Sequence, residues 1–415
     1  MPPTVEEPKL GDDSPHCDDV PVFEPPPNWP LAEIRKVIPK HCFERSTARS
    51  LGYLLRDLAM SGGAMFLASH IDEMSTYAGA SLPSGYAILG PQVVLALKCI
   101  MWAAYWWVQS LVFTGMWILA HECGHRAFSP SGFVSDLVGF TLHSGLITPY
   151  WSWKIAHHHH HQYHGSMEHD EFWIPDTRSE LGIPETHDES VVAEYFSDSP
   201  LYCLAKLLAI HFFAFQTYLL TNLSGQKRFP RGTSHYNPYA VIFKDSQRRS
   251  IIWSDIGVIA MLFILSRFNW RSAVPLYWIP WFGLSHWVVF ITFLQHTDPV
   301  IPRYRDGAWS FVRGAAATVD RDFLGWQGKF FMHGSCHWHT VHHHFPKIPF
   351  YNGREATEHL KAFMGKHYVY SDTPIFQTFW YNWNHCKFVE DKGTVLFLRD
   401  KRGRYARRVA EDKQS

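Results

Sequence analysis

Three groups of histidines have the spacing expected of metal ligands on helices. Two histidines lie four residues apart in the first group, and each of the other two groups has the pattern HxxHH. Because residues three and four apart share one face of a helix, each group presents two or three imidazole rings toward one point. Eight neutral imidazoles are too many for one first-row transition metal and suit two. The sequence therefore predicts a two-metal site with these ligands: His121, His125, His157, His160, His161, His339, His342 and His343.

The first group also matches a different metal motif. His121, Glu122 and His125 fit the HExxH pattern of zinc proteases, in which the glutamate is the general base. An intramembrane zinc protease is therefore an alternative, but it needs only one further ligand and leaves both HxxHH groups without a role. Two metal ions per chain would favour the two-metal site, and one zinc ion would favour the protease.

Two interpretations without catalysis also account for many histidines. The run from His157 to His161 could be a metal-binding surface tract, although it is internal and accompanies two other groups. A metal transporter would need ionisable groups inside its spans. The uncharged run Cys99–Ala120 has none, and Ser272–Gln295 contains only His286. The other histidines near the groups are interpreted as solvated or neighbouring residues: His164, His169, His333, His337 and His344.

The composition is that of a membrane protein with a large polar part. The 415 residues include 18 Trp, 30 Phe and 18 Tyr, and such an excess of aromatic residues is typical of membrane interfaces. A mean hydropathy of −0.16 requires a polar portion outside the bilayer. The 38 basic residues balance 38 acidic residues, so there is no field that would attract nucleic acid. The seven cysteines form no CxxC pair, so neither a disulfide framework nor a zinc ribbon is indicated.

Two uncharged runs are long enough to cross a membrane. As a helix, Cys99–Ala120 would extend about 33 Å, and Ser272–Gln295 is longer still. Weaker candidates are Leu51–Ile71, Leu207–Leu223 and Ile251–Leu265, of which the first and the third contain charged residues.

The order of these runs favours four spans. If Leu51–Ile71 and Cys99–Ala120 form a hairpin, His121 emerges on the N-terminal side of the membrane. An even number of spans between His161 and His339 returns the chain to that side, and Ile251–Leu265 with Ser272–Gln295 is the favoured pair. We therefore expect an all-α integral membrane protein with about four transmembrane helices and a cytosolic helical cap that holds the two-metal site. Six spans are the alternative.

The ends of the chain differ from its middle. Residues 1–27 are acidic, polar and rich in proline, with no apolar core of a signal peptide, so they are predicted to be a disordered N-terminal lead. Residues 28–395 are predicted to form the main domain, and residues 396–415 a basic polar C-terminal tail.

The motifs together resemble a known family. HECGH followed by two HxxHH groups in a membrane chain resembles the membrane-bound fatty acid desaturases, and most closely the microsomal oleate Δ12 desaturases of fungi, over residues 28–395. The stretches that carry the resemblance are IPKHCFERSTARSL (38–51), HECGHRAFSPS (121–131), PYWSWKIAH (149–157), LQHTDPVIPRYRDGAW (294–309), RGAAATVDRD (313–322) and HHHFPKIPFYN (342–352).

The resemblance implies a complete enzyme system. It implies a non-haem centre of two iron ions held by the eight histidines, O2 as co-substrate, and cytochrome b5 with its reductase as electron donor. It implies an acyl-lipid or acyl-CoA substrate, conversion of an oleoyl to a linoleoyl chain, and an endoplasmic-reticulum membrane with the active site facing the cytosol. Related enzymes use a further histidine near the end of the last span, and His296 is the candidate here. Glu122 fits the Δ12 group, with a positioning role.

The chemistry explains why metal would be needed. The C–H bonds of an acyl chain are unactivated, so no side-chain base can remove a proton from them. An oxidant made from O2 at two metal ions can remove hydrogen atoms instead. Two of the electrons that reduce O2 to water come from the substrate, and the other two come from a donor. The chain has no dinucleotide-binding fingerprint and no haem-domain signature, so the electrons are expected from a separate protein.

The third histidine group departs from the family pattern. Relatives usually carry an acidic residue where this chain has His337, and a valine where it has Thr340. A carboxylate orients a ligating imidazole better than histidine does, so His337 is predicted to lie behind the third group and to influence the reaction outcome. Acetylenase, conjugase or hydroxylase activity on the same scaffold is therefore the alternative, with some product other than a simple diene.

Overall fold

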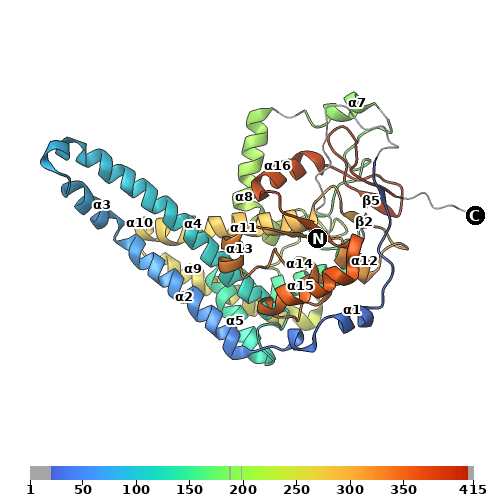
Figure 1. The fold of residues 1–415 in the computed structure, drawn as a ribbon, viewed down its shortest axis with the longest axis horizontal. Coiled ribbons are helices and arrows are strands. Elements are labelled where there is room, and N and C mark those ends of the chain that lie inside the picture. Colours follow the sequence, from blue (N-terminus) through green and yellow to red (C-terminus); the bar gives the residue numbers. More distant parts are fainter. Residues whose placement is uncertain (1–19, 187, 198, 410–415) are drawn as a thin grey trace, which may run out of the picture.

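Two long antiparallel helices form an arm of the molecule (Figure 1). They are α2 (Thr47–Ser69) and α4 (Gly90–Gly124), and α3 (Ile71–Ala80) turns the chain at the tip of the arm. The side chain of Ser46 caps α2 by accepting a hydrogen bond from the backbone N–H of Arg49. A helix of 35 residues is about 52 Å long and exceeds the roughly 30 Å of a hydrocarbon core.

A third long helix, α11 (Ile279–His296), lies between α4 and α8 (Pro200–Thr221) and contacts both. The fourth, α9 (Arg248–Ser266), is joined to α11 through α10 (Trp270–Ala273) and η5 (Val274–Trp278). The largest cluster of buried apolar side chains lies among these helices, and it includes Trp287, Phe290 and Leu294 of α11. This packing holds the C-terminal ends of α4 and α11 side by side.

The structure, a computed structural model, describes residues 20–186, 188–197 and 199–409. Within these ranges four helical segments are long and apolar enough to cross a membrane: Gly90–Gly124, Pro200–Thr221, Asp245–Ser266 and Trp270–His296. This confirms the predicted helical membrane architecture with about four candidate spans. One of these four segments differs from the four predicted spans. The segment Pro200–Thr221 is long and apolar enough to cross, whereas α2, which was predicted as a span, carries Arg49, Arg56 and Asp57 and is not apolar enough.

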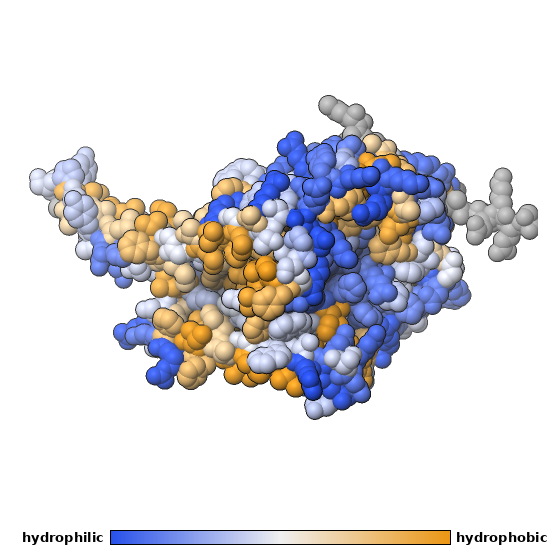
Figure 2. Space-filling view, turned by 90° about the horizontal axis from the view of Figure 1, so that it is seen from below, coloured by the Kyte–Doolittle hydropathy of each residue, from blue (hydrophilic) through white to orange (hydrophobic). Residues whose placement is uncertain are grey.

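A polar cap of shorter elements covers one end of the long helices. Figure 2 shows apolar side chains gathered along the arm and the middle of the molecule, while hydrophilic side chains predominate over the cap. The helices of the described cap are α1 (Leu31–Val37), α5 (Gly132–Gly145), α6 (Tyr150–Tyr163), α7 (Glu189–Glu194), α12 (Phe311–Ala316), α13 (Trp326–Phe331), α14 (His339–His344), α15 (Phe350–Met364) and α16 (Ile375–His385).

Three two-stranded pairings connect distant parts of the chain within the cap. They join β1 (Val22–Phe23) to β6 (Arg408–Val409), β2 (Pro302–Tyr304) to β5 (Val395–Phe397), and β3 (Val319–Arg321) to β4 (Val369–Ser371). The predicted boundary between residues 395 and 396 thus falls within β5, and residues 408–409 pair with residues 22–23. Of the predicted disordered lead, residues 1–19 lie outside the described residues.

Candidate metal centre

Four helix ends converge on one buried point beneath the cap. His121 lies in the last turn of α4, and His125 follows it as the C-cap residue. The second group lies on α6, and the third lies on α14. His296 is the last residue of α11. The structure thus brings together all nine histidines that the sequence predicts as ligands.

Five of these rings form one group. The Nε2 atoms of His121 and His157 are 2.9 Å apart, and those of His157 and His161 are 3.0 Å apart. The Nε2 atom of His342 lies 3.1 Å from that of His121. With His125, these residues offer five ligand atoms that all lie within 4.8 Å of one another. We call this set group A.

The other four rings form a second group beside the first. The Nε2 atoms of His160 and His296 are 3.3 Å apart, and those of His296 and His339 are 3.1 Å apart. His343 completes the chain of contacts, with its Nε2 atom 3.2 Å from that of His339. We call this set group B. The rings of His161 and His343 stack at 4.2 Å between centroids, so groups A and B are adjacent.

The geometry of both groups fits bound metal ions. Two nitrogens bound to one metal at about 2.1 Å and at right angles lie about 3 Å apart, which is the observed spacing. Burial lowers the pKa of His157, His161 and His343 well below the ordinary value, with neighbouring histidines adding to the effect. The rings are therefore neutral, and facing nitrogen lone pairs repel each other unless a cation lies between them. Neutral imidazole is a preferred ligand of iron, zinc and copper.

A buried carboxylate orients one ring of group B. Asp170 Oδ1 lies 2.7 Å from His160 Nδ1, which leaves His160 Nε2 free to face the group. The guanidinium of Arg303 donates to Asp170 Oδ2 at 3.0 Å. Burial alone would raise the pKa of Asp170, but the contacts with His160 and His164 hold it well below the ordinary value. Asp170 lies outside the stretches that carry the family resemblance, and Arg303 lies in one of them, residues 294–309, but the sequence alone assigned it no role.

Glu122 lies on the far side of two rings of group A. Its Oε1 atom is 3.5 Å from His121 Nδ1 and 3.9 Å from His342 Nδ1, whereas the Nε2 atoms of both rings face the group. Its Oε2 atom accepts a hydrogen bond from the backbone N–H of Phe350. A general base for a metal-bound water would have to reach the Nε2 side, so this geometry favours a positioning role over that of the zinc-protease glutamate.

We expect Glu122→Gln to retain bound metal and part of the activity. Glutamine can keep its single oxygen toward the two Nδ1–H groups, but it loses the negative charge and turns an NH2 donor toward the Phe350 N–H, so about a tenfold loss in metal affinity or activity is expected. The measurement is metal per purified chain together with product yield. A chain that keeps its metal but loses all activity would instead indicate that Glu122 acts directly in the reaction.

The neighbouring histidines occupy different positions. His164 lies against group B, with its Nε2 donating to the carbonyl of Ala317 and its Nδ1 3.3 Å from Asp170. The ring of His333 contacts Asp57 of α2 at 2.8 Å, and His344 is bonded to the carbonyl of Thr340. His169 contacts Arg228 and Asp306 near the surface.

His337 lies against Asp322 rather than against a ring of the third group. Its Nε2 atom is 3.1 Å from Asp322 Oδ1, and burial lowers its pKa to about 4. Among the described residues it takes part in none of the metal-binding groups. Thr340, the other departure from the family pattern, has a clear structural partner. Its backbone N–H and its hydroxyl donate to buried Asp320 at 2.7 and 3.0 Å, which anchors the start of α14.

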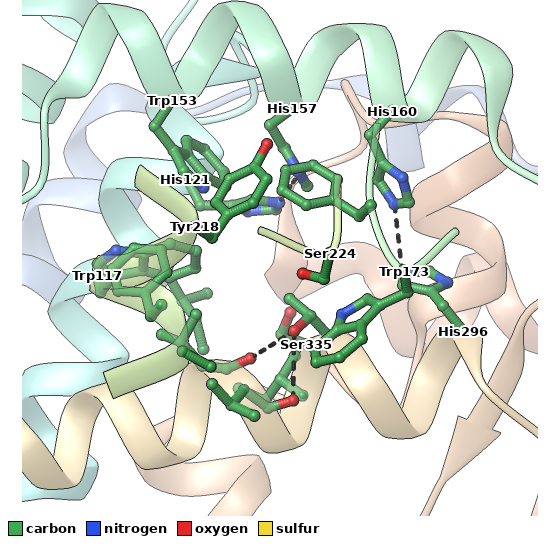
Figure 3. A pocket seen from close by; sticks show the side chains of 18 of the residues that line it. Trp117, His121, Trp153, His157, His160, Trp173, Tyr218, Ser224, His296 and Ser335 are labelled. Carbon is green, nitrogen blue, oxygen red and sulfur yellow. Dashed lines mark hydrogen bonds between the residues drawn. The ribbon is translucent and has the colours of Figure 1, made fainter. Parts of the chain in front are cut away.

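An apolar cavity adjoins both groups (Figure 3). His157 and His160 point into it from α6, and α11 forms the opposite wall. Apart from the histidines, most lining residues are aromatic or aliphatic; they include Trp117, Trp153, Phe172, Trp173, Phe215, Tyr218, Val288 and Ile291.

Comparison with known proteins agrees with this centre. The sequence model described as "Fatty acid desaturase" matches residues 100–374, and one described as "Domain of unknown function (DUF3474)" matches residues 6–65. A Delta(12) fatty acid desaturase of Mortierella isabellina is 38% identical over 90% of this chain and 91% of its own length.

Two other similar proteins are named for different activities. An oleate hydroxylase of Claviceps purpurea is 37% identical over 91% of this chain and 82% of its own. A fatty acid conjugase of Calendula officinalis is 35% identical over 90% of this chain and 93% of its own. Given the match over most of its length and the histidine centre between apolar helices, the chain belongs to the fatty acid desaturase family and is a membrane-bound oxidoreductase that acts on lipid.

Proposed function

We propose that this desaturase converts an oleoyl to a linoleoyl chain by inserting a cis double bond at Δ12. One iron ion would be held by group A and the other by group B. The observation that carries the proposal is the apolar cavity, because it is lined by rings from both groups and by aromatic and aliphatic side chains. An acyl chain in this cavity would bring C–H bonds of its middle part beside the metal ligands.

The residues of this chain would position the substrate and exclude water. The irons would supply, with O2, the oxidation of unactivated C–H bonds. The substrate loses two hydrogen atoms, a donor supplies two electrons, solvent supplies two protons, and O2 becomes two molecules of water. The apolar lining keeps bulk water from the reacting carbons. Trp153 stacks on His157 at 4.2 Å between centroids and holds that ring in place at the cavity wall.

We further propose cytochrome b5 and its reductase as the source of the electrons. The family resemblance supports this donor, an endoplasmic-reticulum location and a centre that faces the cytosol. The convergence of all nine histidines at the cap end of the long helices is compatible with this arrangement, because a soluble or anchored donor must approach from one side of the membrane.

A second activity has support from the relatives and from His337. Proteins named as an oleate hydroxylase and a fatty acid conjugase match this chain nearly as well as the Δ12 desaturases do. Small changes near the third group could therefore redirect the oxidation toward a hydroxylated, conjugated or acetylenic chain.

The direct test of both candidate activities is product analysis. The chain is expressed in a eukaryotic host that makes only monounsaturated fatty acids, and fatty methyl esters are identified by gas chromatography–mass spectrometry. Linoleate as the main new product is expected, and a variant lacking His157 serves as the inactive control. A hydroxylated, conjugated or acetylenic main product would replace the Δ12 assignment by the corresponding activity. Two irons per purified chain are expected, and one zinc would contradict the proposed centre.

We expect His337→Asp to change the ratio of the products toward the diene. Since Asp322 lies 3.1 Å from the ring, the change is made together with Asp322→Asn, so that two carboxylates do not face each other. His337 precedes His339 by two residues, so its anchoring influences how firmly that ring is held. The measurement is the ratio of other products to diene with oleate and with linoleate supplied, and Asp322→Asn alone is the control. An unchanged ratio would make His337 a neutral variation.

A further inference from the structure

The number of membrane crossings between the second and third histidine groups must be even. His161 and His343 stack on each other, so both groups lie on the same side of the membrane. Three helical segments between them are long and apolar enough to cross: Pro200–Thr221, Asp245–Ser266 and Trp270–His296. Three crossings would place the two groups on opposite sides. At least one of these segments therefore does not cross.

Helices α9 and α11 behave as a crossing pair. The chain reverses between them at residues 267–269, after which α10, η5 and α11 form one helical segment, Trp270–His296. The backbone N–H of Trp151, at the start of α6, donates to Ser254 in the first half of α9 at 2.8 Å. Helix α11 ends at His296, inside the metal centre. The pair thus leaves the histidine side with α9 and returns to it with α11.

Both flanks of α8, in contrast, are held by the cap. Before the helix, Arg178 forms an ion pair with Glu390 at 2.8 Å, and the ring of Phe196 stacks on that of Phe388. After the helix, the side-chain amide of Gln226 donates to the backbone carbonyl of Asp170 at 3.0 Å. In Figure 1, α8 also stands steeply against α11 and the α2–α4 arm.

Before the second histidine group, helix α2 crosses the membrane as the partner of α4. Thr47, its first residue, is hydrogen-bonded to Ser129 at 2.7 Å, and Arg45 donates to the carbonyl of Arg126. These partners directly follow the first histidine group. The chain therefore enters α2 and leaves α4 on the histidine side, so this hairpin crosses twice even though α2 contains charged residues.

We propose that α8 lies in the plane of the membrane, at the headgroup–acyl boundary of the leaflet on the histidine side, and binds lipid along its apolar surface. Leu201, Leu204 and Phe213 are exposed by 76, 53 and 54%, which in water would cost hydrophobic free energy at three large side chains. The C-terminal half of α8 packs on α11 and contributes Phe215 and Tyr218 to the cavity wall.

The polar side chains on and near α8 fit an interface. Lys206 lies six residues into the helix, so in a spanning helix its charge would be about 9 Å inside the membrane. Its ammonium group lies 5.8 Å from the ring of Trp383 and 6.0 Å from that of Tyr202. On neighbouring α16, Trp380 is exposed by 59%. Lysine, tryptophan and tyrosine together are typical of the headgroup level.

Labelling of cysteines from one side of the membrane tests this topology. In an active variant without native cysteines, Ser197→Cys and Arg231→Cys place probes before and after α8. The controls are Lys401→Cys on the cap and Arg267→Cys between α9 and α10. We expect the first three positions to react with a membrane-impermeant maleimide in sealed microsomes, and Arg267→Cys to react only after permeabilisation. Reaction of Ser197→Cys and Arg231→Cys from opposite sides would overturn the proposal.

A depth measurement distinguishes lipid contact from exposure to water. Nitroxide labels are placed at Leu204 and Leu208, which lie four residues apart on one face of α8, and at Ile259 in α9 as a spanning control. We expect equal and shallow depths at the two α8 positions, and a greater depth at Ile259. A depth that changes by about 1.5 Å per residue along α8, or relaxation by water-soluble reagents alone, would contradict the proposal. Neither readout depends on the reaction, so the proposed activity stands or falls separately.

Discussion

Replacement of His160 by alanine is expected to reduce product formation by more than about 100-fold and to lower the iron content of the chain, whereas His158→Ala retains most of both. Loss of an outer hydrogen-bond partner of a metal ligand already costs roughly 10–100-fold, so loss of a ligand costs more. His160 is 2% exposed, and its Nε2 atom faces that of His296 at 3.3 Å. His158 lies on the same helix but its side chain points to the surface.

The pair is a matched test because both variants remove one histidine from the same helix. Iron per purified chain and product yield are measured at equal protein levels in the membrane. Equal losses in the two variants, with both proteins stably folded, would count against the assignment of His160 to group B. A loss in His160→Ala alone would support the assignment of His160 to group B. It would also show that the activity does not require every histidine of the run from His157 to His161.

The second large effect is expected from Asp170→Asn. The carboxylate holds His160 Nδ1 at 2.7 Å, so that the Nε2 atom of the same ring faces the metal position. Asparagine keeps the shape but loses the charge that stabilises the Nδ1–H donor and compensates buried Arg303, which is 3% exposed. We expect roughly a 10–100-fold loss in metal affinity and activity.

Asp306→Asn serves as the control for Asp170→Asn. Asp306 is an exposed carboxylate that lies 3.5 Å from the surface ring of His169, the residue before Asp170 in the chain. Metal retention during dialysis against a chelator separates the role of Asp170 in holding metal from a later role in the reaction. If Asp170→Asn retained metal as tightly as the wild type, Asp170 would not be the group that orients His160. Thermal unfolding of both variants measures the separate cost of leaving Arg303 without its charge partner.

The sequence alone was informative about which residues could do the chemistry. Spacings of three and four residues follow directly from the helical repeat, so the HxxHH groups identify ligand faces without knowledge of the fold. Hydrophobic length predicted the regions of α4, α9 and α11, because a span requires about 20 apolar residues wherever it lies. With an even number of crossings between them, all three histidine groups were expected to share one face of the membrane.

Tertiary structure alone decided how the ligands are divided between the two groups. His157 and His161 face group A while His160 faces group B, and on α14 His342 is separated from His339 and His343 in the same way. The helical repeat defines which residues share one face of a helix. It does not define how that helix is rotated against the three others, because this rotation depends on packing between residues that are far apart in the sequence. The same holds for Asp170, whose role arises from contacts with His160 and Arg303. For α8, the order of the apolar runs already favoured α9 and α11 as the crossing pair, whereas the contacts that tie the residues before and after α8 to the cap come only from the fold.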